Sequence, residues 1–197
     1  NDDQRSGKVE EAIEASLKRL GMDYVNLYLV HWPVKETYVS VWKKMEAVYK
    51  SGKAKAIGVS NYQTHHLADL LEEAEIIPAV NQIECYPYLS QAATIQYCLE
   101  RNIRPEAWGP LGAGKSDILT NPVITEIAKK RGLTPAQVVL GWNLERGVIV
   151  IPKSIHKERL TENLKCTDFE LTDEDMTRIS ALNKNLRLGA DPDHFNF

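Results

Sequence analysis

The sequence has few cysteines, and none of them are arranged as metal ligands usually are. Cys85, Cys98 and Cys166 are the only cysteines among 197 residues, and no two of them have CxxC spacing. Such sparse thiols disfavour a disulfide framework and a zinc site, and they favour a reducing, cytoplasmic location. We therefore expect no metal site.

The sequence also lacks a strong excess of charge and a long apolar run. Its 24 basic and 27 acidic side chains give a formal net charge of −3, so a broadly cationic surface for nucleic acid is not expected. No uncharged stretch reaches the roughly 18 residues needed to span a bilayer, and the first residues contain no signal-peptide core. We expect neither nucleic acid nor a membrane as a partner, and one globular domain over residues 1–197.

What the chain does contain is a regular alternation of helix and strand patterns. Apolar residues at helical spacing predict helices over 9–20, 37–51, 64–74, 91–101, 121–146 with a break near Gly132, 156–164, and a last helix capped by Thr172. Apolar and β-branched runs predict five strands, at 24–32, 55–60, 79–84, 103–108 and 148–152. The first strand has the pattern of a strand buried on both faces, whereas Pro105 makes the fourth less regular. Strict alternation predicts an α/β fold with parallel strands and right-handed crossovers.

Each predicted strand ends in, or is directly followed by, polar or aromatic residues. They are His31, then Ser60 and Asn61, then Gln82 and Glu84, then Trp108, and finally Lys153 and Ser154. In parallel α/β folds the carboxyl ends of the strands build the binding site, so these residues are candidates for one common site. Taken singly, a Ser or Asn after a strand is more often a helix cap.

Several separated motifs together resemble the aldo-keto reductase family. They are "DYVNLYLVHWP", "GVSNY", "NQIE", "AWGPLG", "IPKS" followed by "KERLTEN", and "DPDHFNF", in that order over nearly the whole chain. The resemblance implies a (β/α)8 TIM barrel, of which residues 1–197 cover about strands 4 to 8. It also implies an NADP(H)-dependent oxidoreductase that reduces small aldehydes or ketones to alcohols by hydride transfer, monomeric at full length.

The cluster of positive charge after the fifth predicted strand is the candidate site for the 2′-phosphate of NADP(H). Lys153 lies where a strand ends and a helix begins, and the free N–H groups and dipole of a helix start favour an anion. The resemblance implies that Lys153 and Ser154 bind the 2′-phosphate and that Arg159 stacks on the adenine or helps to hold the phosphate. It also implies that Glu162 and Asn163 contact the adenine. The alternative is a helix start whose cations face only water.

The resemblance assigns the nicotinamide end of the cofactor to the other strand ends. Ser60, Asn61 and Gln82 are implied to bind the carboxamide, and Trp108 to stack on the ring. For Trp108 the alternative is ordinary core packing. Gly109 stands where the family more often has serine.

The same resemblance implies roles for three further residues. Leu111 is implied to help wrap the pyrophosphate, together with Gly109. The neutral imidazole of His31 is implied to donate a hydrogen bond to the substrate carbonyl, and Trp32 to line the substrate pocket. A lone histidine after an apolar strand is otherwise usually a satisfied buried polar group.

Only one of the four catalytic residues that the resemblance implies has a counterpart in the sequence. The histidine is present, whereas the aspartate, the lysine and the proton-donating tyrosine are not matched. Because a barrel of this type needs about 250 residues and eight strands, we expect residues 1–197 to be part of a longer enzyme. Two alternatives stay open: a non-catalytic NADP(H)-binding barrel fragment, and a different (β/α)8 phosphate-binding enzyme.

Overall fold

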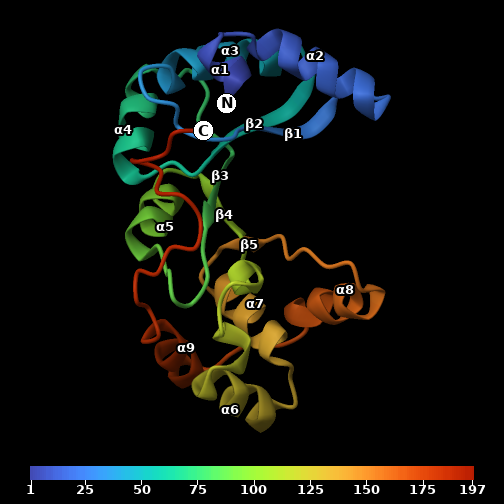
Figure 1. Cartoon of the computed structure of the whole chain (residues 1–197), viewed down its shortest axis with the longest axis vertical. Coiled ribbons are helices and arrows are strands. Elements are labelled where there is room, and N and C mark those ends of the chain that lie inside the picture. The colour runs from blue at the N-terminus through green and yellow to red at the C-terminus, as the bar shows by residue number, and fades with distance from the viewer. The chain divides into compact units, whose positions relative to one another are not determined.

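A computed structural model describes all residues from 1 to 197 (Figure 1). The helices are α1 (Asp2–Arg5), α2 (Val9–Leu20), α3 (Tyr38–Lys50), α4 (Thr64–Glu73), α5 (Ala92–Leu99), α6 (Pro122–Arg131), α7 (Pro135–Glu145), α8 (Lys157–Leu164) and α9 (Asp173–Ser180). The strands are β1 (Val25–Val30), β2 (Ala54–Ser60), β3 (Val80–Glu84), β4 (Arg104–Trp108) and β5 (Ile149–Val150). No helix combines the length and the apolar character needed to cross a membrane.

The five predicted strands are confirmed, and they lie in the sheet in chain order. The pairs β1–β2, β2–β3 and β4–β5 are parallel, as the alternation with helices predicts. A glycine allows the close packing of β2, because a Cβ on Gly58 would lie 2.6 Å from the carbonyl oxygen of Val80 and 2.8 Å from Leu29. The chain therefore has the parallel α/β architecture that the sequence predicts.

The contacts of the chain cluster into two compact units. Unit 1 contains residues 1–82, 96–104 and 192–197, and unit 2 contains residues 83–95 and 105–191. Strands β3 and β4 contribute residues to both units. The expected single domain stays a prediction.

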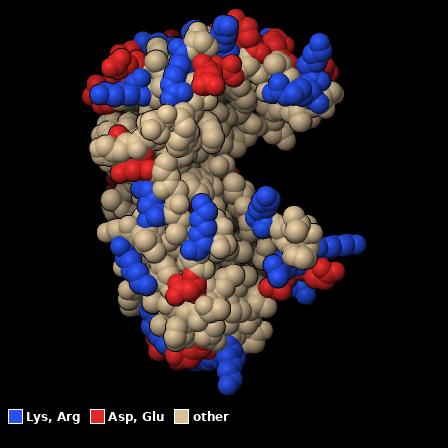
Figure 2. All heavy atoms as spheres, in the orientation of Figure 1, with Lys and Arg blue, Asp and Glu red and all other residues tan.

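Unit 1 is built on β1, β2 and the start of β3. Helices α2 and α3 pack against each other, and α3 also contacts β1, β2 and α4. Apolar side chains of these elements form one core, with Ile13, Trp42, Val59, Leu67 and Ile103 among its most buried members. In Figure 2 the visible surface of α1–α3 carries intermixed basic and acidic side chains.

Unit 2 is helical around β4 and β5. Helix α7 contacts β5, α6 and α8, and α6 also contacts α9. Its core contains Ile83, Tyr86, Ile127, Val139 and Trp142, all nearly or fully buried. The predicted break between two helices near Gly132 is confirmed, because Gly132 ends α6 in the left-handed conformation with φ 66°.

Some predicted features differ in the structure. Strand β1 is only half-buried along most of its length, because it is the first strand of the sheet and has one neighbour. Strand β5 has two residues instead of five. Pro105 does not interrupt β4, since Glu106 and Ala107 beyond it pair with β5.

Candidate functional site

Three of the candidate residues are joined by hydrogen bonds at the ends of β2 and β3 in unit 1. Ser60 Oγ donates to the carbonyl oxygen of Gln82 at 2.8 Å, and the backbone N–H of Asn61 donates to the same oxygen at 2.8 Å. Asn61 adopts a left-handed backbone with φ 65°, which asparagine tolerates better than most residues. This turn aims the Asn61 side chain back across the strand ends, where the structure brings Ser60, Asn61 and Gln82 together.

The Asn61 amide also connects this group to the residue after β1. Its Nδ2 atom donates to the carbonyl oxygen of His31 at 3.0 Å and to Ser60 Oγ at 3.2 Å. The His31 imidazole itself is exposed, but neighbouring protein atoms still lower its pKa by desolvation. The imidazole is therefore neutral at neutral pH and can donate one hydrogen bond.

Trp32 is packed under the last residues of the chain. Its ring centroid lies 5.0 Å from that of Phe195 and 5.2 Å from that of Phe197, and the residue is only 6% exposed. The backbone carbonyl of Phe197 is held by Arg5, which donates from Nη2 at 2.8 Å. The Trp32 indole is therefore buried beneath the aromatic rings of Phe195 and Phe197.

The nicotinamide-stacking candidate, Trp108, ends β4 in unit 2 and is half-buried. Its carbonyl oxygen accepts a hydrogen bond from the N–H of Cys85. The glycine-rich turn begins directly afterwards, with Gly109 at φ 60° and Gly112 at φ 76°, and Leu111 is half-buried between them. Left-handed glycines turn the backbone sharply here, which suits a loop that offers its N–H groups to a ligand.

The predicted phosphate cluster lies between β5 and α8, also in unit 2. Lys153 and Arg159 are exposed and Ser154 is half-buried, with its Oγ accepting from the N–H of His156 at 3.1 Å. No side chain makes a capping hydrogen bond at the start of α8, which leaves its first N–H groups without a side-chain acceptor. This combination of helix start, serine and basic side chains matches the chemistry that a phosphate requires.

The two predicted adenine contacts also have structural roles. Glu162 Oε1 accepts from Thr134 Oγ1 at 2.7 Å, and the Glu162 carbonyl accepts from Gln137 at 3.1 Å. Asn163 is only 7% exposed. Glu162 therefore helps to hold α8 against the start of α7.

The candidate residues thus form two groups. His31, Trp32, Ser60, Asn61 and Gln82 belong to unit 1. The remaining candidates belong to unit 2: Trp108, Gly109, Leu111, Lys153, Ser154, Arg159, Glu162 and Asn163.

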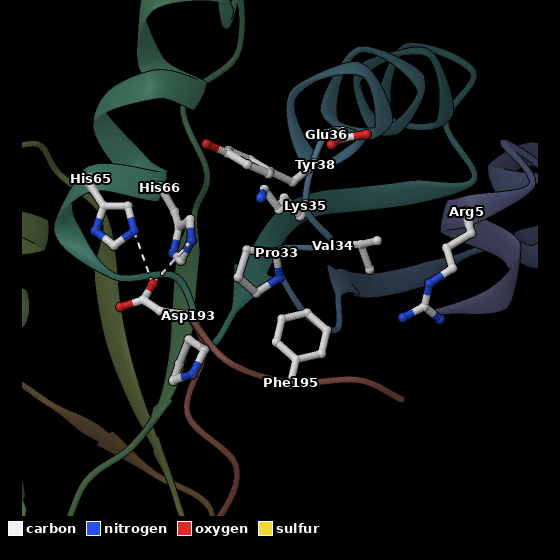
Figure 3. A pocket seen from close by; sticks show the side chains of 11 residues that line it. Arg5, Pro33, Val34, Lys35, Glu36, Tyr38, His65, His66, Asp193 and Phe195 are labelled. Carbon is white, nitrogen blue, oxygen red and sulfur yellow. Dashed lines mark ion pairs between the residues drawn. The ribbon is translucent and has the colours of Figure 1, made fainter.

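A pocket of about 600 Å³ in unit 1 was not predicted (Figure 3). On one side His65 and His66 point from the start of α4 toward Asp193, whose Oδ1 lies 3.0 Å and 3.4 Å from their Nε2 atoms. Pro33 and Phe195 line the other part of the pocket. The two histidines are adjacent in sequence, but Asp193 follows by more than a hundred residues, so no local pattern could pair them.

The ligand atoms of His65, His66 and Asp193 lie within 4.8 Å of one another, which is close enough for a metal ion. However, His66 Nδ1 accepts a hydrogen bond from the N–H of Gln63 at 3.2 Å. A neutral imidazole with an accepting Nδ1 holds its proton on Nε2, the atom that a metal would need. The arrangement is therefore that of a hydrogen-bonded clamp between α4 and the segment around Asp193.

Comparison with known proteins adds evidence on the family. A profile of the aldo/keto reductase family matches residues 1–184. Among curated proteins, an uncharacterised oxidoreductase of Bacillus subtilis is 50% identical, with 94% of this chain and 66% of the relative covered. A glyoxal reductase of the same organism is 49% identical, with 100% of this chain and 71% of the relative covered. The chain thus spans about two thirds of the length of these relatives.

Solved structures agree with this result. An aldo-keto reductase from a deep-sea metagenome library is 41% identical with a TM-score of 0.96, covering 100% of this chain and 73% of the other. A silkworm aldo-keto reductase (Bombyx mori), solved as a complex with NADPH, is 38% identical with a TM-score of 0.88, covering 93% of this chain and 62% of the other. The match of the family profile to most of the residues, with the parallel sheet and these relatives, shows that the chain belongs to the aldo/keto reductase family.

Proposed function

We propose that this chain binds NADPH and takes part in the reduction of aldehydes and ketones to alcohols. The observation that best supports the proposal is the interlocked group at the ends of β1, β2 and β3. There Asn61 bridges Ser60 Oγ and the His31 carbonyl, while Ser60 and Asn61 share the Gln82 carbonyl. Polar groups that are already fixed at these strand ends suit the recognition of a carboxamide.

Two further sets of residues would hold the cofactor. Lys153, Ser154 and Arg159 would bind the 2′-phosphate, and Trp108 would cover one face of the nicotinamide ring. When bound, NADPH supplies a hydride to the carbonyl carbon and becomes NADP⁺, and the carbonyl oxygen takes up one proton. Glu162, which is held in place by Thr134 and Gln137, and Asn163 would contact the adenine.

His31 is the proposed catalytic residue of this chain. Its imidazole would donate a hydrogen bond to the substrate oxygen, which draws electron density from the carbonyl carbon and orients it. Desolvation lowers the His31 pKa, so the imidazole is in the neutral, singly donating form over the neutral pH range.

The proposed substrates are small and contain an aldehyde or ketone. Relatives named glyoxal reductase and methylglyoxal reductase are 49% and 43% identical to this chain, so glyoxal and methylglyoxal are suitable first probes. We propose a cytoplasmic location, which is supported by three cysteines that are all buried and unpaired.

A second candidate function is NADP(H) binding without turnover. This candidate applies to residues 1–197 taken by themselves, among which the catalytic tyrosine that the family resemblance implies has no counterpart. Without a proton donor the alkoxide formed by hydride transfer would not be protonated by the protein.

The first experiment compares the binding of NADPH and NADH to the wild type, Lys153→Met and Lys157→Met. Lys157 is another exposed lysine, at the start of α8, and it is not proposed to contact the cofactor. We expect Lys153→Met to weaken NADPH binding about tenfold or more, as for a lost charged hydrogen bond, and to leave NADH binding unchanged. Lys157→Met should change neither by more than about threefold, as for an exposed charge outside the contact.

Turnover then separates the two candidate functions. Oxidation of NADPH that depends on methylglyoxal, and that is lost in His31→Ala, supports carbonyl reduction. Tight NADPH binding with no aldehyde-dependent oxidation supports the binding function instead. A wild-type chain that does not bind NADPH contradicts both.

A further inference from the structure

Glu84, at the end of β3, holds the backbone of a distant loop in unit 2. Its Oε1 atom accepts a hydrogen bond from the N–H of Leu188 at 2.7 Å, and its Oε2 atom accepts from the N–H of Gly189 at 3.0 Å. The residue is only 1% exposed. A buried carboxylate with one N–H on each oxygen is a strong and directional anchor, because both hydrogen bonds are charge-assisted.

The anchored loop touches the indole of Trp108. A Cβ atom built on Gly189 would lie 2.6 Å from Trp108 Cη2 and 3.2 Å from Glu84 Oε2. A side chain at this position would collide with the Trp108 ring and crowd the Glu84 carboxylate, so the glycine backbone packs directly on the edge of the ring. Glu84, Gly189 and Trp108 form one continuous stack.

Neighbouring residues hold the preceding part of the loop by weaker bonds. The Tyr86 hydroxyl donates to the Leu186 carbonyl at 2.9 Å, and the Tyr88 carbonyl accepts from the N–H groups of Lys184 and Leu186 at 3.0 Å each. These bonds are neutral and reach only residue 186. At residues 188 and 189, where the loop meets the indole, both backbone N–H groups donate to Glu84, and the Leu188 side chain also packs against the core of unit 2.

We propose that Glu84 is a positioning residue that presses the loop at residues 188–189 against Trp108 and so fixes the orientation of the indole for stacking on the nicotinamide. This inference rests on the proposed function, in which Trp108 covers the cofactor ring. Glu84 acts through Trp108 and does not itself touch the cofactor. Loss of the anchor lets the loop move from the ring edge, and the indole then has more than one orientation.

Two substitutions test the stack from opposite ends. Glu84→Ala removes both acceptors, whereas Gly189→Ala keeps the carboxylate and drives a methyl group into the ring edge. We expect each to raise the dissociation constant for NADPH about tenfold, with little change in turnover at saturating NADPH. Glu84→Gln, which keeps the shape but has one acceptor in place of two, should lie between Glu84→Ala and the wild type. The control is Glu174→Gln, at an exposed glutamate of α9, which should bind NADPH as tightly as the wild type does.

Tryptophan fluorescence measures the environment of the Trp108 indole directly. The part of the NADPH-induced quenching that Trp108→Phe removes belongs to Trp108, and we expect this part to fall in Glu84→Ala and in Gly189→Ala. A buried glutamate with a purely structural role would change the melting temperature but not this signal in the folded protein. Circular dichroism identifies any variant that does not fold; if Glu84→Ala is one, Glu84→Gln and Gly189→Ala provide the test.

The outcomes are distinct from those for the proposed function. Wild-type NADPH binding, with weaker binding and reduced Trp108 quenching in the folded variants, supports the inference. Wild-type binding with unchanged affinity and quenching in the folded variants overturns it while the proposed function stands. Absence of NADPH binding in the wild type overturns the proposed function and the inference together.

Discussion

Tyr62 has a hydroxyl group that is buried in unit 1 without a hydrogen-bond partner. The ring itself is well packed, with the Tyr38 ring at 5.8 Å and the His66 ring at 5.9 Å. Burying an unpaired hydroxyl costs free energy, because the group loses its bonds to water. We expect Tyr62→Phe to raise the free energy of unfolding by about 1 kcal/mol, as measured by urea denaturation.

Tyr62→Leu is the control for this substitution, since it also removes the hydroxyl but loses the aromatic packing. It should lower the free energy of unfolding by about 1–3 kcal/mol. A loss of stability in Tyr62→Phe would instead mean that the hydroxyl has a partner in solution.

His66 makes the stability of unit 1 depend on pH. Its pKa is lowered to about 4, mainly by desolvation and secondly by His65, while Asp193 and Asp69 oppose the shift. Because the folded pKa lies below the unfolded value of 6.5, the unfolded chain binds the proton first as the pH falls. The contribution of His66 is therefore complete above pH 6.5 and decreases between pH 6.5 and about 4.

We expect the wild type to lose about 1–2 kcal/mol of stability from this group between pH 7 and pH 5. His66→Asn should lose less over the same range, because asparagine does not titrate but still offers an oxygen to the Gln63 N–H. Urea denaturation of both proteins at the two pH values measures the difference. Equal losses in the two proteins would show that His66 is not the titrating group.

At the scale of elements, the start of α7 links helix stability to the candidate cofactor site. Thr134 Oγ1 accepts from the N–H of Gln137 at 3.3 Å, and Gln137 Oε1 accepts from the N–H of Thr134 at 3.0 Å, which is a capping box. The same Thr134 hydroxyl donates to Glu162 on α8. We expect Thr134→Ala to lower the free energy of unfolding by about 1–2 kcal/mol, measured by thermal denaturation.

Thr134→Ser keeps the hydroxyl and separates capping from the loss of the methyl group. It should retain most of the wild-type stability, because serine caps helices at least as well as threonine. A similar loss in both variants would assign the effect to packing of the methyl group.

The sequence predicts elements well where the signal is local. The helix that ends at Gly132 and the helix that begins after Thr172 follow from capping chemistry, and both are confirmed. Strand β5 is shorter than predicted because an apolar run does not specify how many residues find a pairing partner. Strand β1 has the pattern of a strand buried on both faces but is half-buried, because among residues 1–197 it has one neighbour in the sheet.

The candidate site was likewise predicted where the signal is local and missed where it depends on distant segments. Ser60, Asn61 and Gln82 were identified because they lie at or near the carboxyl ends of strands, and the structure joins them. The roles of Glu84 and His66 were not predicted, since each depends on a segment more than a hundred residues away in the sequence. Chain alternation gives the order of parallel strands, but it contains no information about which strand end an irregular tail will contact.

At the scale of the whole molecule, the three cysteines report on both units. Cys98 lies in unit 1, Cys85 and Cys166 lie in unit 2, and all three are buried and free. Burial raises the pKa of Cys85 and of Cys98 to about 11, and it also raises that of Cys166. Because the thiolate is the reactive form, we expect none of the three to react readily with an aromatic disulfide reagent at pH 7, and all three to react in denaturant.

The order in which these thiols react at intermediate urea concentrations tests the prediction of a single domain. Residues 80–82 of β3 belong to unit 1 and residues 83–84 to unit 2, and β4 is shared in the same way. Opening either unit therefore breaks strands that the other unit uses, so we expect Cys85 and Cys98 to become reactive over the same urea range. Peptide mass spectrometry after labelling assigns each modified cysteine. If Cys98 reacts while Cys85 is still protected, or the reverse, the units unfold separately and the chain is two cooperative domains, because exposure of a fully buried thiol requires the local core to open.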